Sequence, residues 1–144
     1  MPVVASPVDV RTTMDGSEQN PSASGPLSIS ITAARGLARA RTTLRRWLRA
    51  SIPNENADEI LLASGEALAN ALEHGQIPIT LRAEWVDRTL HLTVRDSGSW
   101  RPADAPSRDR SRGLGIPIMT ALTDNLAFDT TNGTAVTLSR RFTT

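Results

Sequence analysis

Three polar residues spaced four apart mark the part of the chain best equipped for chemistry. Glu66, Asn70 and His74 lie in the run Glu-Ala-Leu-Ala-Asn-Ala-Leu-Glu-His-Gly, residues 66–75. On a helix they share one stripe. A carboxylate there can accept a proton, and a carboxamide oxygen one turn away can bind a hard cation. The pattern alone predicts a solvated helix face equally well, so other segments must decide between the two.

Two helices are expected to position this stripe. The first covers residues 34–50, and Pro53 ends it; the second runs from about Glu55 to His74 and ends at Gly75. Each has an apolar face at helical spacing, which predicts a side that packs on a core. Those faces consist of Leu37, Leu44, Trp47 and Leu48 in the first helix and Leu61, Leu68 and Leu72 in the second.

The remaining elements are mostly strands. Apolar and polar residues alternate over 27–31, 79–85 and 90–94, and the last two runs flank Asp87-Arg88 as in a hairpin. A helix is expected over 115–122, and a final hairpin turns at Asn132-Gly133. This order predicts an α+β fold, a two-layer α/β sandwich whose mainly antiparallel sheet has helices on one face. Residues 1–26 are expected to be a disordered tail, and residues 27–144 a single domain.

Composition excludes several classes of function. All sixteen basic residues are arginine, so the lysine of a P-loop NTPase or of a eukaryotic-type protein kinase is missing. The chain has no cysteine and a net charge of +1, which argue against thiolate metal sites and against direct nucleic-acid binding. It has no apolar run of membrane-spanning length and no signal-peptide pattern at Met1 to Val10. A cytoplasmic protein without membrane contact is the expectation.

Three further motifs contain glycine next to polar residues. Asp96-Ser97-Gly98 ends a predicted strand, and Ser111 to Ile116 (Ser-Arg-Gly-Leu-Gly-Ile) precedes a predicted helix. Backbone N–H groups at such a helix start can face a phosphate. Asn132-Gly133-Thr134 lies at the last hairpin. Each motif taken singly is also ordinary turn or loop chemistry.

The order of the four motifs is more specific than any one of them. An asparagine helix, Asp-x-Gly after a strand, Gly-x-Gly before a helix and Gly-Thr at the last strand follow the order of the N, G1, G2 and G3 boxes. Over residues 27–142 the chain resembles the Bergerat-fold (GHKL, histidine-kinase-like) ATPase superfamily. Within it, the chain looks like the anti-sigma regulatory factors that are serine/threonine-protein kinases, which carry Glu-x-x-x-Asn-x-x-x-His-Gly, as residues 66–75 do.

The resemblance implies ATP and Mg²⁺ as cofactors and a role for each matching residue. Asn70 would bind the magnesium, Glu66 would be the catalytic general base, and Asp96 would contact the adenine amino group. The other cofactor-binding residues implied are Gly98 beneath the ring, Thr134 near the adenine, Gly113 and Gly115 along the triphosphate, and Arg112, Leu114 and His74. The alternative for His74 is a histidine at a helix C-terminus, favoured there by the helix dipole.

The resemblance also implies partners in transcription regulation. Such proteins bind a sigma factor and phosphorylate an anti-anti-sigma (STAS-type) antagonist, and many form homodimers. Arg41, at the rim of the apolar stripe of the first helix, matches an arginine that contacts both partners. The alternative for Arg41 is a place on a solvated basic face.

One position departs from the family pattern. The second glycine of the G1 box is replaced by Trp100, followed by Arg101-Pro102, and tryptophan lacks the conformational freedom of glycine. The polar segment 97–112 matches the ATP lid, where Arg108, Arg110 and Arg112 can pair with phosphates or simply be solvated. Trp100 leaves a second hypothesis open, a nucleotide-dependent binding module without kinase activity. A histidine-kinase catalytic domain is disfavoured, because no helical hairpin with a phosphoacceptor histidine precedes the domain.

Overall fold

The protein is a two-layer α+β sandwich. The computed structural model describes residues 8–10, 25–98 and 115–142. Within them, six strands form one antiparallel sheet in the order β1-β2-β3-β4-β6-β5. The strands are β1 (Val8–Val10), β2 (Leu27–Ile31), β3 (Ile79–Val86), β4 (Thr89–Asp96), β5 (Asn125–Asp129) and β6 (Thr134–Arg141). The fold class expected from the sequence is confirmed.

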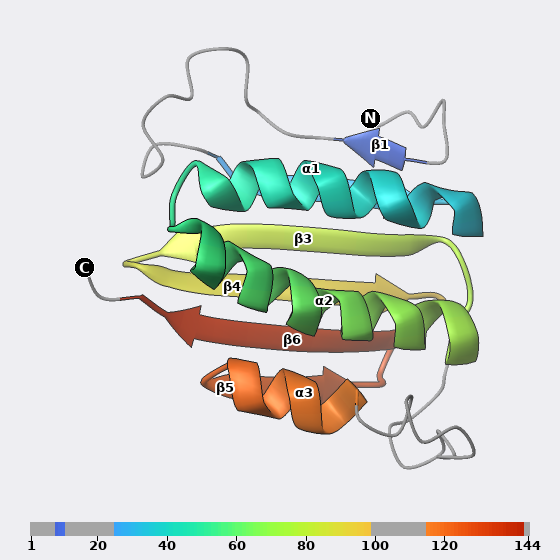
Figure 1. Ribbon diagram of the computed structural model, residues 1–144. Coiled ribbons are helices and arrows are strands. Elements are labelled where there is room, and N and C mark those ends of the chain that lie inside the picture. Colours follow the sequence, from blue (N-terminus) through green and yellow to red (C-terminus); the bar gives the residue numbers. More distant parts are fainter. Residues whose placement is uncertain (1–7, 11–24, 99–114, 143–144) are drawn as a thin grey trace.

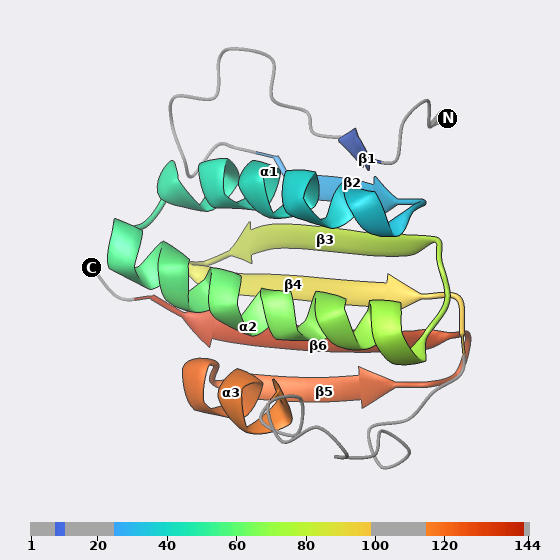
Figure 2. The same ribbon diagram turned by 45° about the vertical axis from the view of Figure 1, so that its right-hand side comes forward.

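Three helices cover one face of this sheet (Figures 1 and 2). They are α1 (Leu37–Arg49), α2 (Asn54–His74) and α3 (Gly115–Leu122), and a short 3₁₀ turn, Ala34–Gly36, precedes α1. α1 packs over β2, α2 over β4 and its neighbours β3 and β6, and α3 over β5. The longest helix therefore lies across the middle of the sheet.

The core lies between the two layers, and the strand register aligns its side chains. Ile29 pairs with Leu81, Leu81 with Val94, and Val94 with Val136, which makes one apolar row across four strands. All four side chains are at most 2% exposed. Burial of each such side chain stabilises the fold by about 1.5–3 kcal/mol. The alternation predicted from the sequence thus fixes which face of the sheet meets the helices.

Both predicted hairpins form. Asp87 and Arg88 have positive φ angles of 49° and 65°, and they connect β3 to β4 by the two-residue turn that suits strand twist. The β5–β6 loop ends at Gly133, whose φ is +77°. Here glycine is required because side chains rarely adopt that conformation.

Two features differ from the sequence-based expectation. The first helix begins at Leu37 and not at residue 34, because residues 34–36 form the tighter 3₁₀ turn. Strand β1 lies within the segment expected to be a disordered tail, where it pairs with β2 over Val8–Val10. Three residues are too few to show a hydrophobic period in the sequence. The strand forms because the edge of β2 offers unpaired backbone groups for it to pair with. The domain boundary at residue 27 stays a prediction.

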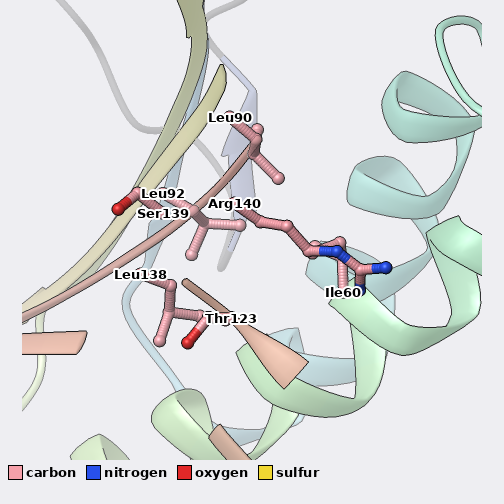
Figure 3. Close-up of a pocket in the computed structure, with 7 residues that line it drawn as sticks. All are labelled: Ile60, Leu90, Leu92, Thr123, Leu138, Ser139 and Arg140. Carbon is pink, nitrogen blue, oxygen red and sulfur yellow. The ribbon is translucent and has the colours of Figure 1, made fainter. Parts of the chain in front are cut away.

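Arg140 joins the helical layer to the sheet. Its Nη1 donates to Glu59 Oε1 of α2 at 2.8 Å and to the carbonyl oxygen of Leu122, at the end of α3, at 3.2 Å. Figure 3 shows the side chain leaving β6 and reaching toward α2 beside Ile60. The guanidinium also lies over the Phe142 ring, 4.9 Å from its centroid. One side chain therefore ties α2, the end of α3 and β6 together.

Aromatic packing closes the end of the sheet near the β3–β4 turn. Trp47 of α1 stacks on Trp85 of β3 with ring centroids 6.0 Å apart, and Trp85 meets the Phe142 edge at 5.7 Å. The indole N–H of Trp47 donates to the Gly25 carbonyl oxygen at 3.3 Å. No helix in the described ranges is long and apolar enough to cross a membrane.

Candidate functional site

Three segments far apart in the sequence meet at one end of the sandwich. The C-terminal end of α2, the end of β4 and the start of β6 lie at the right-hand end of Figure 1, whereas α3 lies lower, beside β5. Asp96 and Thr134 face each other there as register partners. His74, Asp96 and Thr134, which belong to separate motifs of the sequence, lie on these three segments, while Gly115 begins α3.

Asp96 lies at the centre of this end of the sandwich. The residue is only 3% exposed, although its side chain is a carboxylate. The Oδ1 atom accepts a hydrogen bond from the Gly98 N–H at 2.6 Å and a long one from the Gln76 N–H at 3.4 Å. A buried carboxylate is tolerated only where donors surround it. Backbone amides from two loops supply such donors.

A second pair of bonds fastens those two loops together. The Ser97 N–H donates to the Gln76 carbonyl oxygen at 2.9 Å, and the Ser97 hydroxyl donates to the Pro78 carbonyl oxygen at 3.2 Å. The turn after β4 is therefore fixed to the segment after α2. This contact holds the end of the α2 helix at a set distance from Asp96.

Three glycines leave the space that Asp96 occupies. A Cβ on Gly75 would collide with the Asp96 carboxyl group, and one on Gly133 would collide with the Asp96 carbonyl oxygen. A Cβ on Gly98 would lie only 3.1 Å from the Gln76 nitrogen. With the fully buried Thr134, these residues form a close-fitting cradle around one carboxylate, which we call the Asp96 cradle.

Gly75 ends α2 as predicted, but for a different reason. Its φ is −100° and its ψ −153°, so it does not adopt the left-handed conformation that usually favours glycine after a helix. Its N–H still donates to the Ala71 carbonyl oxygen at 3.0 Å. Glycine is needed here because Asp96 approaches the backbone too closely for any side chain.

The α2 stripe leads directly to this cradle. Asn70 is only 9% exposed, and Glu66 and His74 are half-buried. The stripe is therefore not the solvated face that the sequence alone allowed. His74 Nε2 lies 3.5 Å from Glu73 Oε1, a pairing that is ionic only when the histidine is protonated. Because α2 ends at His74, Asn70 and Glu66 lie one and two turns back from the cradle.

Arg41 lies apart from the cradle. It is exposed on α1, and its guanidinium rests against α2 at Gly65: a Cβ built there would be 3.8 Å from the Arg41 Cζ. Gly65 precedes His74 by nine residues, or roughly 14 Å along a helix at its usual rise. The structure thus places Arg41 beside the helix that carries Glu66, away from Asp96.

Some predicted site residues lie outside the described residues. Arg112, Gly113 and Leu114 are among them, as are Trp100, Arg108 and Arg110; Gly115 is the first residue of α3. Sequence reasoning did not find the loop-to-loop bonds of Gln76 and Ser97. Nor did it find the steric role of Gly75 beyond a helix end. The sequence signal that pointed to Gly75 was the His74-Gly75 pair at the end of the predicted helix.

Comparison with known proteins identifies the family. Residues 31–140 match the model of the histidine kinase-like ATPase domain. The chain belongs to this family. The predicted membership of the histidine-kinase-like (GHKL) ATPase superfamily is therefore confirmed. No curated protein sequence matches the chain significantly.

One solved structure similar to this histidine kinase-like ATPase domain is that of the RsbU and RsbW domains of Rv1364c from Mycobacterium tuberculosis. The TM-score is 0.62 and the sequence identity is 26%. The match covers 81% of this chain and 31% of that chain. The domain thus spans about a third of the other protein.

The described residues suit the nucleotide that an ATPase domain implies. Adenine carries an exocyclic amine that donates hydrogen bonds, and a buried carboxylate backed by glycines is a fitting acceptor for it. No group of three histidine, aspartate or glutamate residues within the described ranges can hold a metal ion. A cation bound at this end therefore needs other oxygen ligands, such as a carboxamide and the phosphates of a nucleotide.

Proposed function

We propose that the protein binds ATP with Mg²⁺ and transfers a phosphoryl group to a serine or threonine of a partner protein, as an anti-sigma factor with kinase activity. The observation that carries this proposal is the continuity of the site. The helix bearing Glu66 and Asn70 ends directly against the Asp96 cradle. A base, a cation ligand and an adenine acceptor then follow one another along one surface.

Nucleotide binding would be shared among described and undescribed residues. Asp96 accepts a hydrogen bond from the adenine amine, Gly98 lies under the ring and Thr134 borders it. Asn70 holds the magnesium with its amide oxygen, and His74 lies beside the nucleotide. The residues assigned to the triphosphate are Arg112, Gly113, Leu114 and Gly115. Bound magnesium would neutralise phosphate charge, which is most of what phosphoryl transfer requires of a protein.

Glu66 is the proposed general base. It lies one turn before Asn70 on the same stripe and is half-buried, so it can meet a hydroxyl from a partner and still exclude part of the solvent. Its carboxylate would orient that hydroxyl and accept its proton. A positioned base of this kind contributes about 10²–10⁴ in rate.

Glu66→Gln tests the kinase assignment. With γ-labelled ATP and a STAS-type antagonist, transfer should fall by about 10²–10⁴, because the amide keeps the shape but accepts no proton. ATP affinity, measured by calorimetry, should stay near the wild-type value. Glu55→Gln is the matched control, since Glu55 is an exposed acid in the first turn of the same helix. Transfer at the wild-type rate by Glu66→Gln would refute the base.

The partner contact is proposed at Arg41. It is exposed, and its guanidinium is held against the α2 backbone at Gly65, so a partner that reaches Arg41 also lies next to Glu66. Arg41→Glu should weaken binding to the sigma factor and to the antagonist by about tenfold or more, because reversed charge repels an acidic contact. Arg46→Glu, an equally exposed arginine of α1, should change little. Equal binding by the Arg41→Glu and Arg46→Glu variants in a pull-down titration would refute the partner contact at Arg41.

A second candidate function rests on Trp100. It replaces a glycine of the G1 box, which favours a module that binds partners in a nucleotide-dependent way without transferring phosphate. The labelling experiment separates the two. No transfer by wild-type protein that binds both ATP and the antagonist would select the binding module.

A further inference from the structure

Arg95 precedes Asp96 in the chain but lies on the opposite face of the sheet. Successive residues of a strand point to opposite faces, so Asp96 points toward the helices with Val94, and Arg95 points to the uncovered face. Arg95 is exposed, and its Nη1 donates to the Asn132 carbonyl oxygen at 2.8 Å. This bond runs from β4 to the loop between β5 and β6.

That loop completes the Asp96 cradle. Asn132 is followed directly by Gly133, which has a φ of +77° and lies against the Asp96 carbonyl oxygen without room for a Cβ. Thr134 comes next and is the register partner of Asp96. The carbonyl held by Arg95 therefore belongs to the peptide that joins Asn132 to Gly133, the first of the residues that enclose Asp96.

The other end of the loop is held on the same side. Asp129 Oδ1 accepts a hydrogen bond from the Thr131 N–H at 2.9 Å. The Asp129 pKa is lowered, first by that backbone bond, then by the Thr131 hydroxyl, with a smaller contribution from the positive charge of Arg95. The loop from 130 to 133 is thus fixed at its start by Asp129 and near its end by Arg95.

We infer that Arg95 is a positioning residue for the nucleotide site. Its bond to the Asn132 carbonyl holds the β5–β6 loop where Gly133 and Thr134 close the cradle around Asp96. The inference rests on the proposed nucleotide binding and names a residue that touches no nucleotide. A hydrogen bond from a charged donor to a main-chain carbonyl is stronger than one from a neutral donor. Because the loop is short, loss of this bond should also displace the neighbouring Gly133.

The test compares Arg95→Ala, Arg95→Lys and Arg82→Ala. Arg82 is the matched control, because it is an exposed arginine on the same uncovered face of the sheet and pairs only loosely with Glu84, at 3.8 Å. Two quantities are measured: amide hydrogen exchange at residues 132–134 in nucleotide-free protein, and Mg-ATP affinity by calorimetry. Melting temperatures show whether each variant is folded.

Arg95→Ala should speed exchange at residues 132–134 and weaken Mg-ATP binding by about 3- to 10-fold, which is less than the loss of a charged hydrogen bond to the ligand itself, because Arg95 acts through the loop. Arg95→Lys should restore part of the protection from exchange and part of the Mg-ATP affinity. Arg82→Ala should change neither the exchange nor the affinity. Unchanged exchange and affinity in Arg95→Ala would overturn the inference, as would an affinity loss without faster exchange. If wild-type protein binds no nucleotide, the proposed function fails, and exchange still decides whether Arg95 holds the loop.

Discussion

At the scale of single residues, the site depends on where side chains are missing. Gly75 and Gly65 are both on or next to α2, yet their surroundings differ. A Cβ on Gly75 meets the Asp96 carboxyl group, whereas one on Gly65 meets the Arg41 guanidinium at an ordinary 3.8 Å. The two glycines therefore give a matched pair of substitutions.

Gly75→Ala should displace Asp96 and weaken Mg-ATP binding by about tenfold or more, comparable to the loss of a charged hydrogen bond. Gly65→Ala should leave binding unchanged. It should raise the free energy of unfolding by about 0.5–1 kcal/mol, because alanine replaces glycine inside a helix. For each variant, calorimetry measures the Mg-ATP affinity and urea unfolding measures the free energy of unfolding. Normal binding by a folded Gly75→Ala variant would contradict the close-fitting cradle.

Residue roles were only partly predictable from the sequence. The four-residue spacing placed Glu66, Asn70 and His74 on one stripe, because helical geometry alone determines that. It left open whether the stripe faces solvent, since burial of Asn70 depends on what packs over α2. Arg95 gave no signal, because its bond joins residues 37 positions apart.

At the scale of elements, the β5–β6 loop carries a pH-dependent support. The folded pKa of Asp129 is lowered from 3.8, so its ionised form contributes stability above the unfolded pKa. That contribution is lost as the pH falls through the lowered folded pKa. Asp129→Asn should therefore be less stable than wild type at pH 7, and the difference should vanish well below pH 3.8.

Urea unfolding of Asp129→Asn and wild type at pH 7 and in acid measures this difference. Because Asp129 is exposed, the difference should be small, and salt should reduce only its ionic part. Equal stability at pH 7, or a difference that persists unchanged in acid, would contradict a role for the carboxylate in holding the loop.

Most elements followed from sequence periodicity, and the exceptions have physical causes. Strands β2 to β6 alternate over enough residues to be recognised, and the turns at Asp87-Arg88 and Asn132-Gly133 form where the sequence predicts them. Strand β1 cannot be predicted from periodicity, because three residues carry no period. The start of α1 at Leu37 differs from the prediction, because a 3₁₀ turn and an α-helix have similar local sequence patterns.

At the scale of the whole molecule, the two ends of the sandwich differ in the side chains that they contain. One end, near the β3–β4 turn, is closed by Trp47, Trp85 and Phe142. The other end leaves a buried carboxylate among glycines. Residues 31–140 match the histidine kinase-like ATPase domain, and we propose this second end as its nucleotide site. Arg41 would then let a partner approach from the helical layer.

We propose that the Asp96 cradle binds the adenine of ATP. Asp96→Asn keeps the shape of the side chain but removes its charge, so it should weaken Mg-ATP binding by about 10- to 100-fold, the range for a charged hydrogen bond. Isothermal titration calorimetry on folded wild-type and variant protein measures this directly. We expect clear binding by wild type and its marked loss in Asp96→Asn. No binding by wild type, or equal affinity in both proteins, would contradict it.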